Sequence, residues 1–264
     1  DETLVYPAHG AGSMCGKALS EEAVSTLGDQ KLYNYALQPM TREAFIEMVT
    51  ADQPEAPAYF GYNASLNRQE RLTLKESMSK SMKALDLNEV LTLQKSGAQI
   101  IDVRVMTEFS RAHIQNAISI GLDGRFATWT GTVLDKNTSV IIVAEPDLAE
   151  EAIMRLGRIG FHNVKGYLKG GMESLKENID LTSRIQQVSA TTVDELEGPI
   201  TILDIRSKNE WESSHIEGSI NIPLNNLMDQ ISEVPESGHV IVHCQGGYRS
   251  MIAVSLLEKE GRNN

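Results

Sequence analysis

The second half of the sequence repeats itself. Three short motifs occur twice, and each second copy lies 102 residues after the first. They are Asp102-Val-Arg104 with Asp204-Ile-Arg206, Glu108-Phe109 with Glu210-Trp211, and His113-Ile114 with His215-Ile216. Further on, Val140-Ile-Ile-Val143 returns as Val240-Ile-Val-His243 at an offset of 100, so one two-residue insertion or deletion separates the blocks. A constant offset across so many residue types indicates a duplicated domain.

Each repeat has the pattern of alternating helices and strands. A short helix is expected at 87–96, and another from Thr192, which has capping-box spacing to Glu195. Buried strands are expected at 100–103 and 200–205, followed by further helices and strands. This order predicts two successive α/β domains with parallel sheets.

The second repeat places a cysteine where a strand meets a helix. The apolar run 240–242 predicts a buried strand, Cys244 follows it, and the apolar periodicity after Arg249 predicts a helix. Such a turn points several backbone N–H groups and the positive end of a helix dipole at one spot. The sequence therefore predicts that Cys244 is a thiolate at neutral pH and acts as a nucleophile.

The first repeat lacks this chemistry. Ala144 stands in the place of Cys244, Ala149 stands in the place of Arg249, and Pro146 removes a backbone donor. Four acidic residues surround the turn: Glu145, Asp147, Glu150 and Glu151. Because these carboxylates oppose a bound anion, we predict that the first repeat is catalytically inactive.

Three interpretations compete for Cys244. It could be a buried structural cysteine, the nucleophile of a phosphoryl-transfer loop, or a sulfur carrier. Cysteine phosphatases are similar in having a cysteine, an anion cradle and an arginine, but they place five residues between Cys and Arg. Here four residues, 245–248, separate Cys244 from Arg249. The shorter loop favours a smaller group, a persulfide sulfur held by converging N–H groups.

The motifs then identify a family. Asp204-Ile-Arg206, His215-Ile-Glu-Gly-Ser-Ile-Asn-Ile-Pro223 and Cys244-x-x-Gly-x-Arg249 resemble a rhodanese (sulfurtransferase) domain over 186–264. Residues 84–182 resemble a second, inactive rhodanese domain. Val5-Tyr-Pro-Ala-His-Gly-Ala-Gly-Ser-Met-Cys-Gly16 and Asn34-Tyr-Ala-Leu-Gln-Pro-Met40 resemble the C-terminal part of a metallo-β-lactamase-fold persulfide dioxygenase, which with its linker would occupy 1–76. The expected fold is two tandem doubly wound parallel-sheet domains preceded by the tail of an αββα domain.

The resemblance implies roles for individual residues. Cys244 would accept sulfur as a persulfide, and Arg249 would hold the anionic sulfur or the charged end of the donor. The substrate would also be bound by the loop around them, Gln245, Gly246, Gly247, Tyr248 and Ser250. Asp204, Arg206 and His215 would be structural. His9 falls on the last histidine of the metallo-β-lactamase metal motif, a second-metal position that can be vacant.

Composition limits the partners. The formal charge is −12, which argues against nucleic acid or an anionic membrane as a partner. No run approaches the roughly 18 apolar residues that span a bilayer, and no signal peptide opens the chain. Two cysteines give no disulfide framework, so we expect a cytoplasmic protein. The expected ligands are small persulfides, thiosulfate, sulfite or thiols, and self-association into a homo-oligomer is left open.

The predicted function is sulfur transfer through a Cys244 persulfide, within a fusion enzyme that oxidises low-molecular-weight persulfides to sulfite and so detoxifies sulfide. The rhodanese domain needs no cofactor. A complete dioxygenase domain would hold mononuclear iron, with zinc as the alternative. The alternative function is a non-catalytic docking or dimerisation scaffold for a metallo-β-lactamase-fold hydrolase, such as a thioesterase.

Two further expectations concern the ends of the chain and the region before the repeats. The sequence begins without Met, and the second repeat stops at Gly261-Arg-Asn-Asn264, where the first continues into another strand. We therefore expect a piece of a longer protein. Residues 21–37 and 41–49 are helical by pattern, the second helix capped by Thr41, and 67–83 is polar and linker-like.

Overall fold

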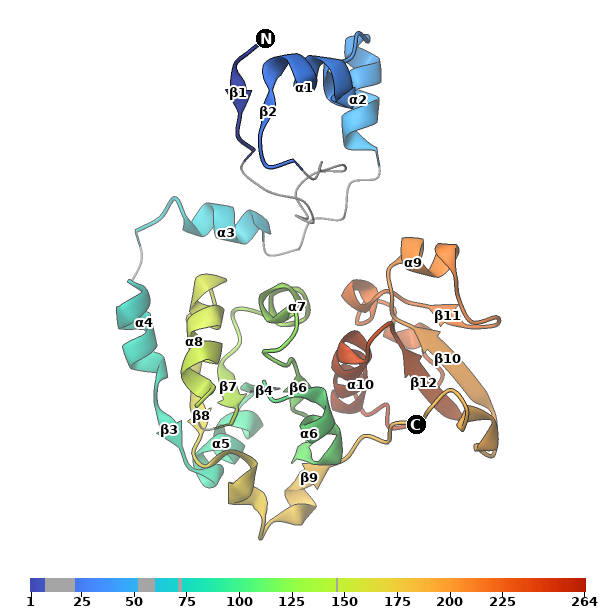
Figure 1. Ribbon diagram of the computed structural model, residues 1–264. Coiled ribbons are helices and arrows are strands. Elements are labelled where there is room, and N and C mark those ends of the chain that lie inside the picture. Colours follow the sequence, from blue (N-terminus) through green and yellow to red (C-terminus); the bar gives the residue numbers. More distant parts are fainter. Residues whose placement is uncertain (8–21, 52–59, 71–72, 146) are drawn as a thin grey trace. The chain divides into compact units, whose positions relative to one another are not determined.

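A computed structural model of the chain describes residues 1–7, 22–51, 60–70, 73–145 and 147–264. The chain divides into two compact units, Asp1–Ala56 and Pro57–Asn264 (Figure 1). Both repeats belong to the second unit. In the described ranges, no helix has the length and apolar character needed to cross a membrane.

The first unit is a short hairpin-like pair of strands followed by helices. Its elements are β1 (Leu4–Val5), β2 (Ser25–Thr26), α1 (Leu27–Tyr33), the 3₁₀ helix η1 (Tyr35–Leu37) and α2 (Arg42–Thr50). The predicted cap of the second helix is confirmed, because Thr41 Oγ1 accepts from the N–H of Ala44. The prediction of one helix over 21–37 is wrong. Ser25 and Thr26 form a strand, and Asn34 has an extended backbone between α1 and η1. His9 and Cys15 lie outside the described residues.

The first repeat is built on a five-stranded parallel sheet with the order β3-β8-β7-β4-β6. Its strands are β3 (Ala84–Leu85), β4 (Gln99–Asp102), β6 (Ile118–Ser119), β7 (Val140–Val143) and β8 (Val164–Leu168). All four residues of β7 are fully buried, as in strands that are covered on both faces. The helices are α5 (Leu87–Lys95), α6 (Met106–Arg111), α7 (Phe126–Val133) and α8 (Ala149–Arg158), with the 3₁₀ helices η2 (Gly171–Leu175) and η3 (Ile179–Leu181).

Two helices precede the first sheet strand, α3 (Phe60–Leu66) and α4 (Leu74–Ser81). The prediction of a linker over 67–83 is therefore wrong for its second part. A capping box begins α4, since Thr73 and Glu76 each bond to the backbone N–H of the other. The helix contacts α8, and Met78 packs against the core. Tertiary packing of this kind stabilises a polar helix that its composition alone does not predict.

The second repeat has a three-stranded parallel sheet with the order β11-β10-β12, which matches β6-β4-β7 of the first repeat. The strands are β10 (Ile200–Asp204), β11 (Ile220–Asn221) and β12 (His239–His243), and the helices are α9 (Lys208–Ser213) and α10 (Tyr248–Lys259). Short 3₁₀ helices supply the rest: η4 (Val193–Glu195), η5 (Leu224–Asn226) and η6 (Ile231–Glu233). The two parallel sheets confirm the predicted α/β fold.

One local prediction for the second repeat is wrong. Thr192 makes no side-chain cap, because its hydroxyl donates to the carbonyl of Ser189 instead. Its backbone is also helical rather than extended, with φ −114° and ψ 0°. The expected helix is therefore the single 3₁₀ turn η4.

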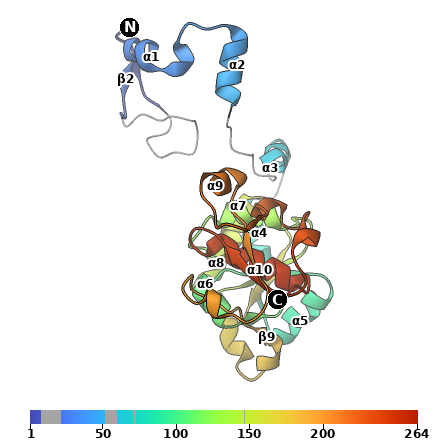
Figure 2. The same ribbon diagram turned by 90° about the vertical axis from the view of Figure 1, so that its right-hand side faces the viewer.

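The two repeats share one continuous core. Ile120 and Phe126 of the first repeat belong to the same buried cluster as Ile252 and Leu256 of α10. Figure 1 shows α10 close to α6 and β6 of the first repeat, and Figure 2 shows the same unit with α10 facing the viewer. The connection between the repeats also follows the first repeat, since β9 (Thr182–Ser183) pairs antiparallel with β5 (His113–Ile114).

Candidate active site

The candidate active site is the turn between β12 and α10. Cys244 directly follows the last residue of β12 and is half-buried. Gly247 ends the turn with a φ of +87°, a left-handed conformation that favours glycine, and α10 starts at Tyr248. The predicted strand–turn–helix arrangement around Cys244 is therefore present.

Three groups surround the sulfur of Cys244. The N–H groups of Gly247 and Ser250 donate to Sγ at 3.1 and 3.4 Å. The thiol in turn donates to the Ser250 hydroxyl oxygen, with the two atoms 3.5 Å apart. These contacts come from the turn and from the first turn of a 12-residue helix, so the positive end of its dipole also faces the sulfur.

This environment lowers the pKa of the Cys244 thiol. Burial by itself raises that pKa, because a buried thiolate loses its hydration. The hydroxyl of Ser250 and the N–H groups of Ser250, Gly246 and Gly247 stabilise the thiolate and together outweigh burial, so the pKa lies below its ordinary value. The environment therefore favours the thiolate more than that of an ordinary cysteine does, and the role of Cys244 as a nucleophile stays a prediction.

Arg249 is held by a carboxylate of the same repeat. Its Nη1 and Nη2 atoms donate to the two carboxylate oxygens of Glu210 at 2.7 and 2.8 Å. Glu210 also accepts from the N–H and the hydroxyl of Ser207 in the capping box of α9. The bonds from Arg249 are the main cause that lowers the pKa of Glu210 to about 2. Binding of an anion by Arg249 stays a prediction, because the guanidinium already has this partner.

The residues assigned a structural role do brace the fold. Arg206 forms a bidentate ion pair with the buried Asp204, with Nη2 and Oδ2 2.6 Å apart, and Nη2 also donates to the carbonyl of Ser214. Arg104 repeats this arrangement with Asp102 and Ala112 in the first repeat.

The histidines at corresponding positions of the two repeats make the same contacts. His215 contacts the carbonyl of Trp211 through Nδ1 and stacks on that ring at 3.9 Å. His113 does the same with Phe109 in the first repeat.

A cavity of about 670 Å³ opens beside Cys244, a size that suits a small ligand. The second repeat lines it with Glu210, Cys244, Gln245, Gly246, Tyr248 and Arg249. The first repeat lines it with Met106, Asp123, Gly124, Arg125 and Trp129. Sequence reasoning missed this second set and also Glu210. The repeat gave a signal only for Glu210, whose counterpart Glu108 pairs with Arg111 instead.

Comparison with known proteins identifies the family. Rhodanese-like domains match residues 86–178 and 189–264, which is more than half of the chain. The chain belongs to the rhodanese-like domain family. The YrkF protein of Bacillus subtilis (strain 168) is 28% identical over 98 residues, which are 37% of this chain and 53% of that protein. The adenylyltransferase and sulfurtransferase uba4 of Ogataea parapolymorpha is 32% identical over 91 residues, 34% of this chain and 23% of that protein.

A solved structure is also similar, that of a metallo-beta-lactamase from Staphylococcus aureus subsp. aureus COL. Its sequence is 26% identical, the match covers 63% of this chain and 44% of that chain, and the TM-score is 0.49. The chain thus spans about half the length of the first of these relatives, or less of the others.

The corresponding turn of the first repeat also lies between a strand and a helix, but alanine stands in the place of the cysteine. Ala144 follows β7 and is buried, and α8 begins at Ala149. Pro146 lies outside the described residues. Glu150 and Glu151 occupy the first turn of α8, where Glu151 pairs with Arg155 at 2.5 Å. Inactivity of this repeat stays a prediction, and no side chain at Ala144 can accept sulfur.

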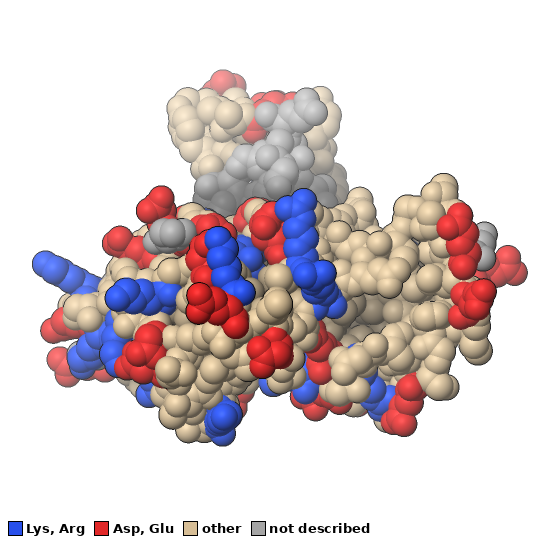
Figure 3. All heavy atoms as spheres, turned by 90° about the horizontal axis from the view of Figure 1, so that it is seen from below, with Lys and Arg blue, Asp and Glu red and all other residues tan. Residues whose placement is uncertain are grey.

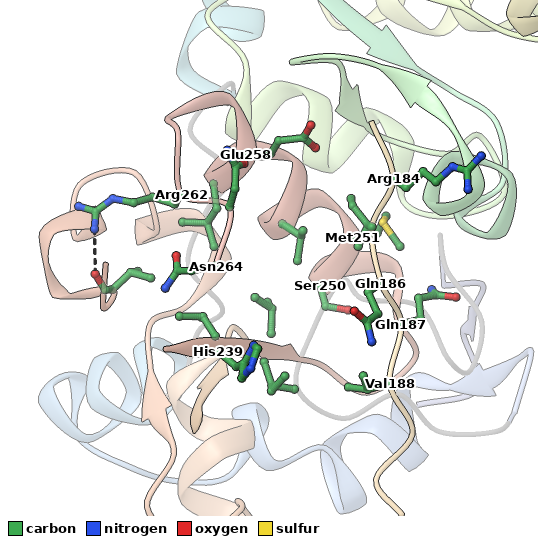
Figure 4. A pocket seen from close by; sticks show the side chains of 18 of the residues that line it. Arg184, Gln186, Gln187, Val188, His239, Ser250, Met251, Glu258, Arg262 and Asn264 are labelled. Atoms are coloured by element: carbon green, nitrogen blue, oxygen red, sulfur yellow. Dashed lines mark hydrogen bonds between the residues drawn. The ribbon is translucent and has the colours of Figure 1, made fainter. Parts of the chain in front are cut away.

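A larger cavity of about 970 Å³ lies along β12 and α10 of the second rhodanese-like repeat (Figure 4). The residues that line it include His239 of β12, Met251 and Glu258 of α10, and Gln186 and Gln187 of the connection. Cys244 is not among the residues that line it. In the first repeat, one edge of β7 pairs with β4 and the other with β8. In the second repeat, β12 pairs with β10 on one edge, and the cavity borders its other edge. Among the described residues, no strand pairs with that second edge.

Proposed function

We propose that the protein is a sulfurtransferase that carries sulfane sulfur as a persulfide on Cys244. The observation that carries this proposal is the convergence of the Gly247 and Ser250 N–H groups on Sγ at the start of α10. Membership of the rhodanese-like family supports it, and so does the sulfurtransferase named among the relatives.

The reaction has two steps in which the same sulfur atom changes partner. The Cys244 thiolate attacks the outer sulfur of thiosulfate, an S–S bond forms, and sulfite leaves with the electron pair of the broken bond. An acceptor such as a thiolate or cyanide then attacks the outer sulfur of the Cys244 persulfide and restores the thiolate. The N–H groups that stabilise the thiolate would stabilise the terminal sulfur of the persulfide in the same way.

The proposed substrate is a small molecule. The cavity beside Cys244 is of ligand size. On the face shown in Figure 3, lysine and arginine are interspersed with aspartate and glutamate, and they do not gather into the broad positive surface that nucleic acids require. A persulfide or thiosulfate as donor, and a thiol or sulfite as acceptor, fit these features.

In the wider enzyme, we propose that this transfer accompanies oxidation of a low-molecular-weight persulfide to sulfite in the cytoplasm. The motif of residues 5–16 supports this extension through its resemblance to persulfide dioxygenases. Iron is the expected metal and zinc is the alternative. Within the described ranges, however, no group of three or more His, Cys, Asp or Glu side chains could hold a metal ion. The described residues therefore do not fit a metal site, and the transfer steps above use the sulfur of Cys244 alone.

The test compares Cys244→Ser with the wild type in sulfur transfer from thiosulfate to cyanide. Cys15→Ser is the matched control, since it removes the other cysteine of the chain. We expect loss of transfer to background in Cys244→Ser and an unchanged rate in the control. Equal rates for Cys244→Ser and the wild type would contradict the proposal and favour the alternative of a docking scaffold.

A further inference from the structure

One face of α10 packs against the first repeat. Tyr248, Met251, Ser255 and Glu258 are spaced by three, four and three residues, so they lie along one side of the helix. We call these four residues the docking stripe. Each of them contacts the first repeat, and the contacts run from the catalytic loop to the far end of the helix.

The far part of the docking stripe is fixed by polar contacts and by burial. Glu258 bonds to Nε2 of the fully buried His113 at 2.8 Å. Ser255 Oγ accepts from the N–H of Ser119 at 3.0 Å. Met251 is 5% exposed and belongs to a hydrophobic cluster formed otherwise by the first repeat. These contacts hold the helix axis against the first repeat.

The near end of the stripe reaches the catalytic loop itself. The Tyr248 hydroxyl donates to the carbonyl of Gly121 at 2.7 Å. Its ring lies flat against Gly124, where an added Cβ would overlap Cε2 and lie only 2.5 Å from Cζ. Met106 packs in the same way against Gly247, where an added Cβ would lie 2.9 Å from Sδ. The first repeat therefore packs tightly against Gly247 and Tyr248, where the catalytic loop ends and α10 begins.

The residues that the first repeat contacts include or adjoin the hydrogen-bond donors to the sulfur of Cys244. Gly247 donates to Sγ and immediately precedes Tyr248, and Ser250 donates from the same helical turn. A displaced Tyr248 ring would rotate the start of α10 and lengthen both bonds. Hydrogen bonds to sulfur weaken with distance and misalignment, so the thiolate would lose the stabilisation that outweighs its burial.

The repeat provides an internal comparison for this surface. The α8 positions that correspond to the docking stripe are Leu148, Glu151, Arg155 and Arg158. Three of the four are charged, and Glu151 pairs with Arg155 on the same helix. Only the second repeat thus has the docking stripe, and only the second repeat has a cysteine in its turn.

We propose that the first repeat positions the catalytic loop of the second, with Gly124 and the Gly121 carbonyl acting as positioning groups through Tyr248. The inference rests on the proposed role of Cys244, and it gives the repeat without a nucleophile a part in the reaction. Gly124 is required because any side chain there would occupy the place of the Tyr248 ring.

The test is a double-mutant cycle in the full chain with Gly124→Ala, Tyr248→Leu and the double variant. Leucine is the residue at the corresponding position 148. Three readouts are needed: transfer from thiosulfate to cyanide, the pH dependence of Cys244 alkylation by iodoacetamide, and thermal unfolding. Gly61→Ala is the matched control, since among the described residues an added Cβ there meets no atom within 4 Å beyond its own helix backbone and chain neighbours.

We expect Gly124→Ala to lower the transfer rate by about 10-fold or more and to move the alkylation midpoint to higher pH. In the double variant, the glycine substitution should add little to the loss from Tyr248→Leu, because the ring that the new methyl group meets is gone. The milder Tyr248→Phe keeps the ring and removes one hydrogen bond, so it should fold and lose about 2- to 5-fold.

Several results would overturn the inference. A wild-type rate and alkylation midpoint in Gly124→Ala would do so, and so would independent losses that multiply in the double variant. A lower melting temperature with an unchanged midpoint would show a purely structural contact. If Gly124→Ala does not fold, a wild-type rate and midpoint in Tyr248→Phe would overturn it. Each of these outcomes leaves the proposed function intact as long as Cys244→Ser abolishes transfer.

Discussion

The two repeats have the same strand–turn–helix order but differ in the side chains that occupy it. Both keep the buried Asp–Arg pair and the stacked histidine, and in both a parallel strand ends at the turn. The second repeat adds Cys244, Arg249 and the docking stripe. The first repeat has alanines in place of Cys244 and Arg249, and one leucine and three charged residues in place of the docking stripe. The features common to both repeats thus maintain the fold, while the proposed chemistry rests on features that only the second repeat has.

Removal of the shared Asp–Arg pair should have the largest effect on stability. Asp102→Ala and Asp204→Ala each leave a largely buried arginine without its carboxylate, which costs about 3 to 5 kcal/mol. We expect the larger loss at Asp102, because the side chain of Arg104 is 6% exposed and that of Arg206 is 15% exposed. Urea unfolding of both variants measures this, with the exposed Asp229→Ala as control. Destabilisation by only one of the two substitutions would contradict a shared structural role.

The glutamate in the first turn of the helix after the Asp–Arg pair should distinguish the repeats. The pKa of Glu210 is lowered from 4.5 to about 2, so its ion pair stabilises the folded state fully above pH 4.5 and is lost as the pH falls towards 2. The side chain is 36% exposed, which reduces the contribution to about 1 to 2 kcal/mol.

Glu210→Gln should therefore lower the free energy of unfolding near neutral pH and leave it unchanged near pH 2. Glu108→Gln is the matched variant in the first repeat, where the carboxylate pairs with the exposed Arg111. We expect an effect of less than about 0.5 kcal/mol from it. Unfolding curves between pH 2 and 7 test both variants. Equal losses of free energy of unfolding in the two variants would show that the ion pair with Arg249 contributes no more than the exposed pair with Arg111.

Much of the fold could be predicted because the same sequence pattern occurs twice in the chain. The constant offset, the apolar runs and the turn after them predicted the two parallel sheets and the start of α10 at the Cys244 turn. Local sequence also predicted the cap at Thr41. It failed where tertiary contacts decide the structure, as in α4, which is stabilised against α8, and at Thr192, whose hydroxyl turns back to Ser189.

The site was only half predictable for the same reason. Cys244 and the donors around it are neighbours in the sequence, so their arrangement follows from the turn. The wall formed by Asp123, Gly124 and Trp129 is more than 100 residues away in sequence, and no local pattern records that contact. The docking stripe did have a signal, because the charged Glu151 and Arg155 of the first repeat correspond to the uncharged Met251 and Ser255 of the second.

The most direct test of the central claim places a cysteine in both turns. In Ala144→Cys, position 144 gains a thiol, but the four acidic residues and Pro146 still oppose a bound anion, so we expect no transfer through it. After incubation with thiosulfate, mass spectrometry of alkylated peptides locates the added sulfur. We predict a persulfide on Cys244 and none at position 144. A persulfide at position 144, or none on Cys244, would contradict the account.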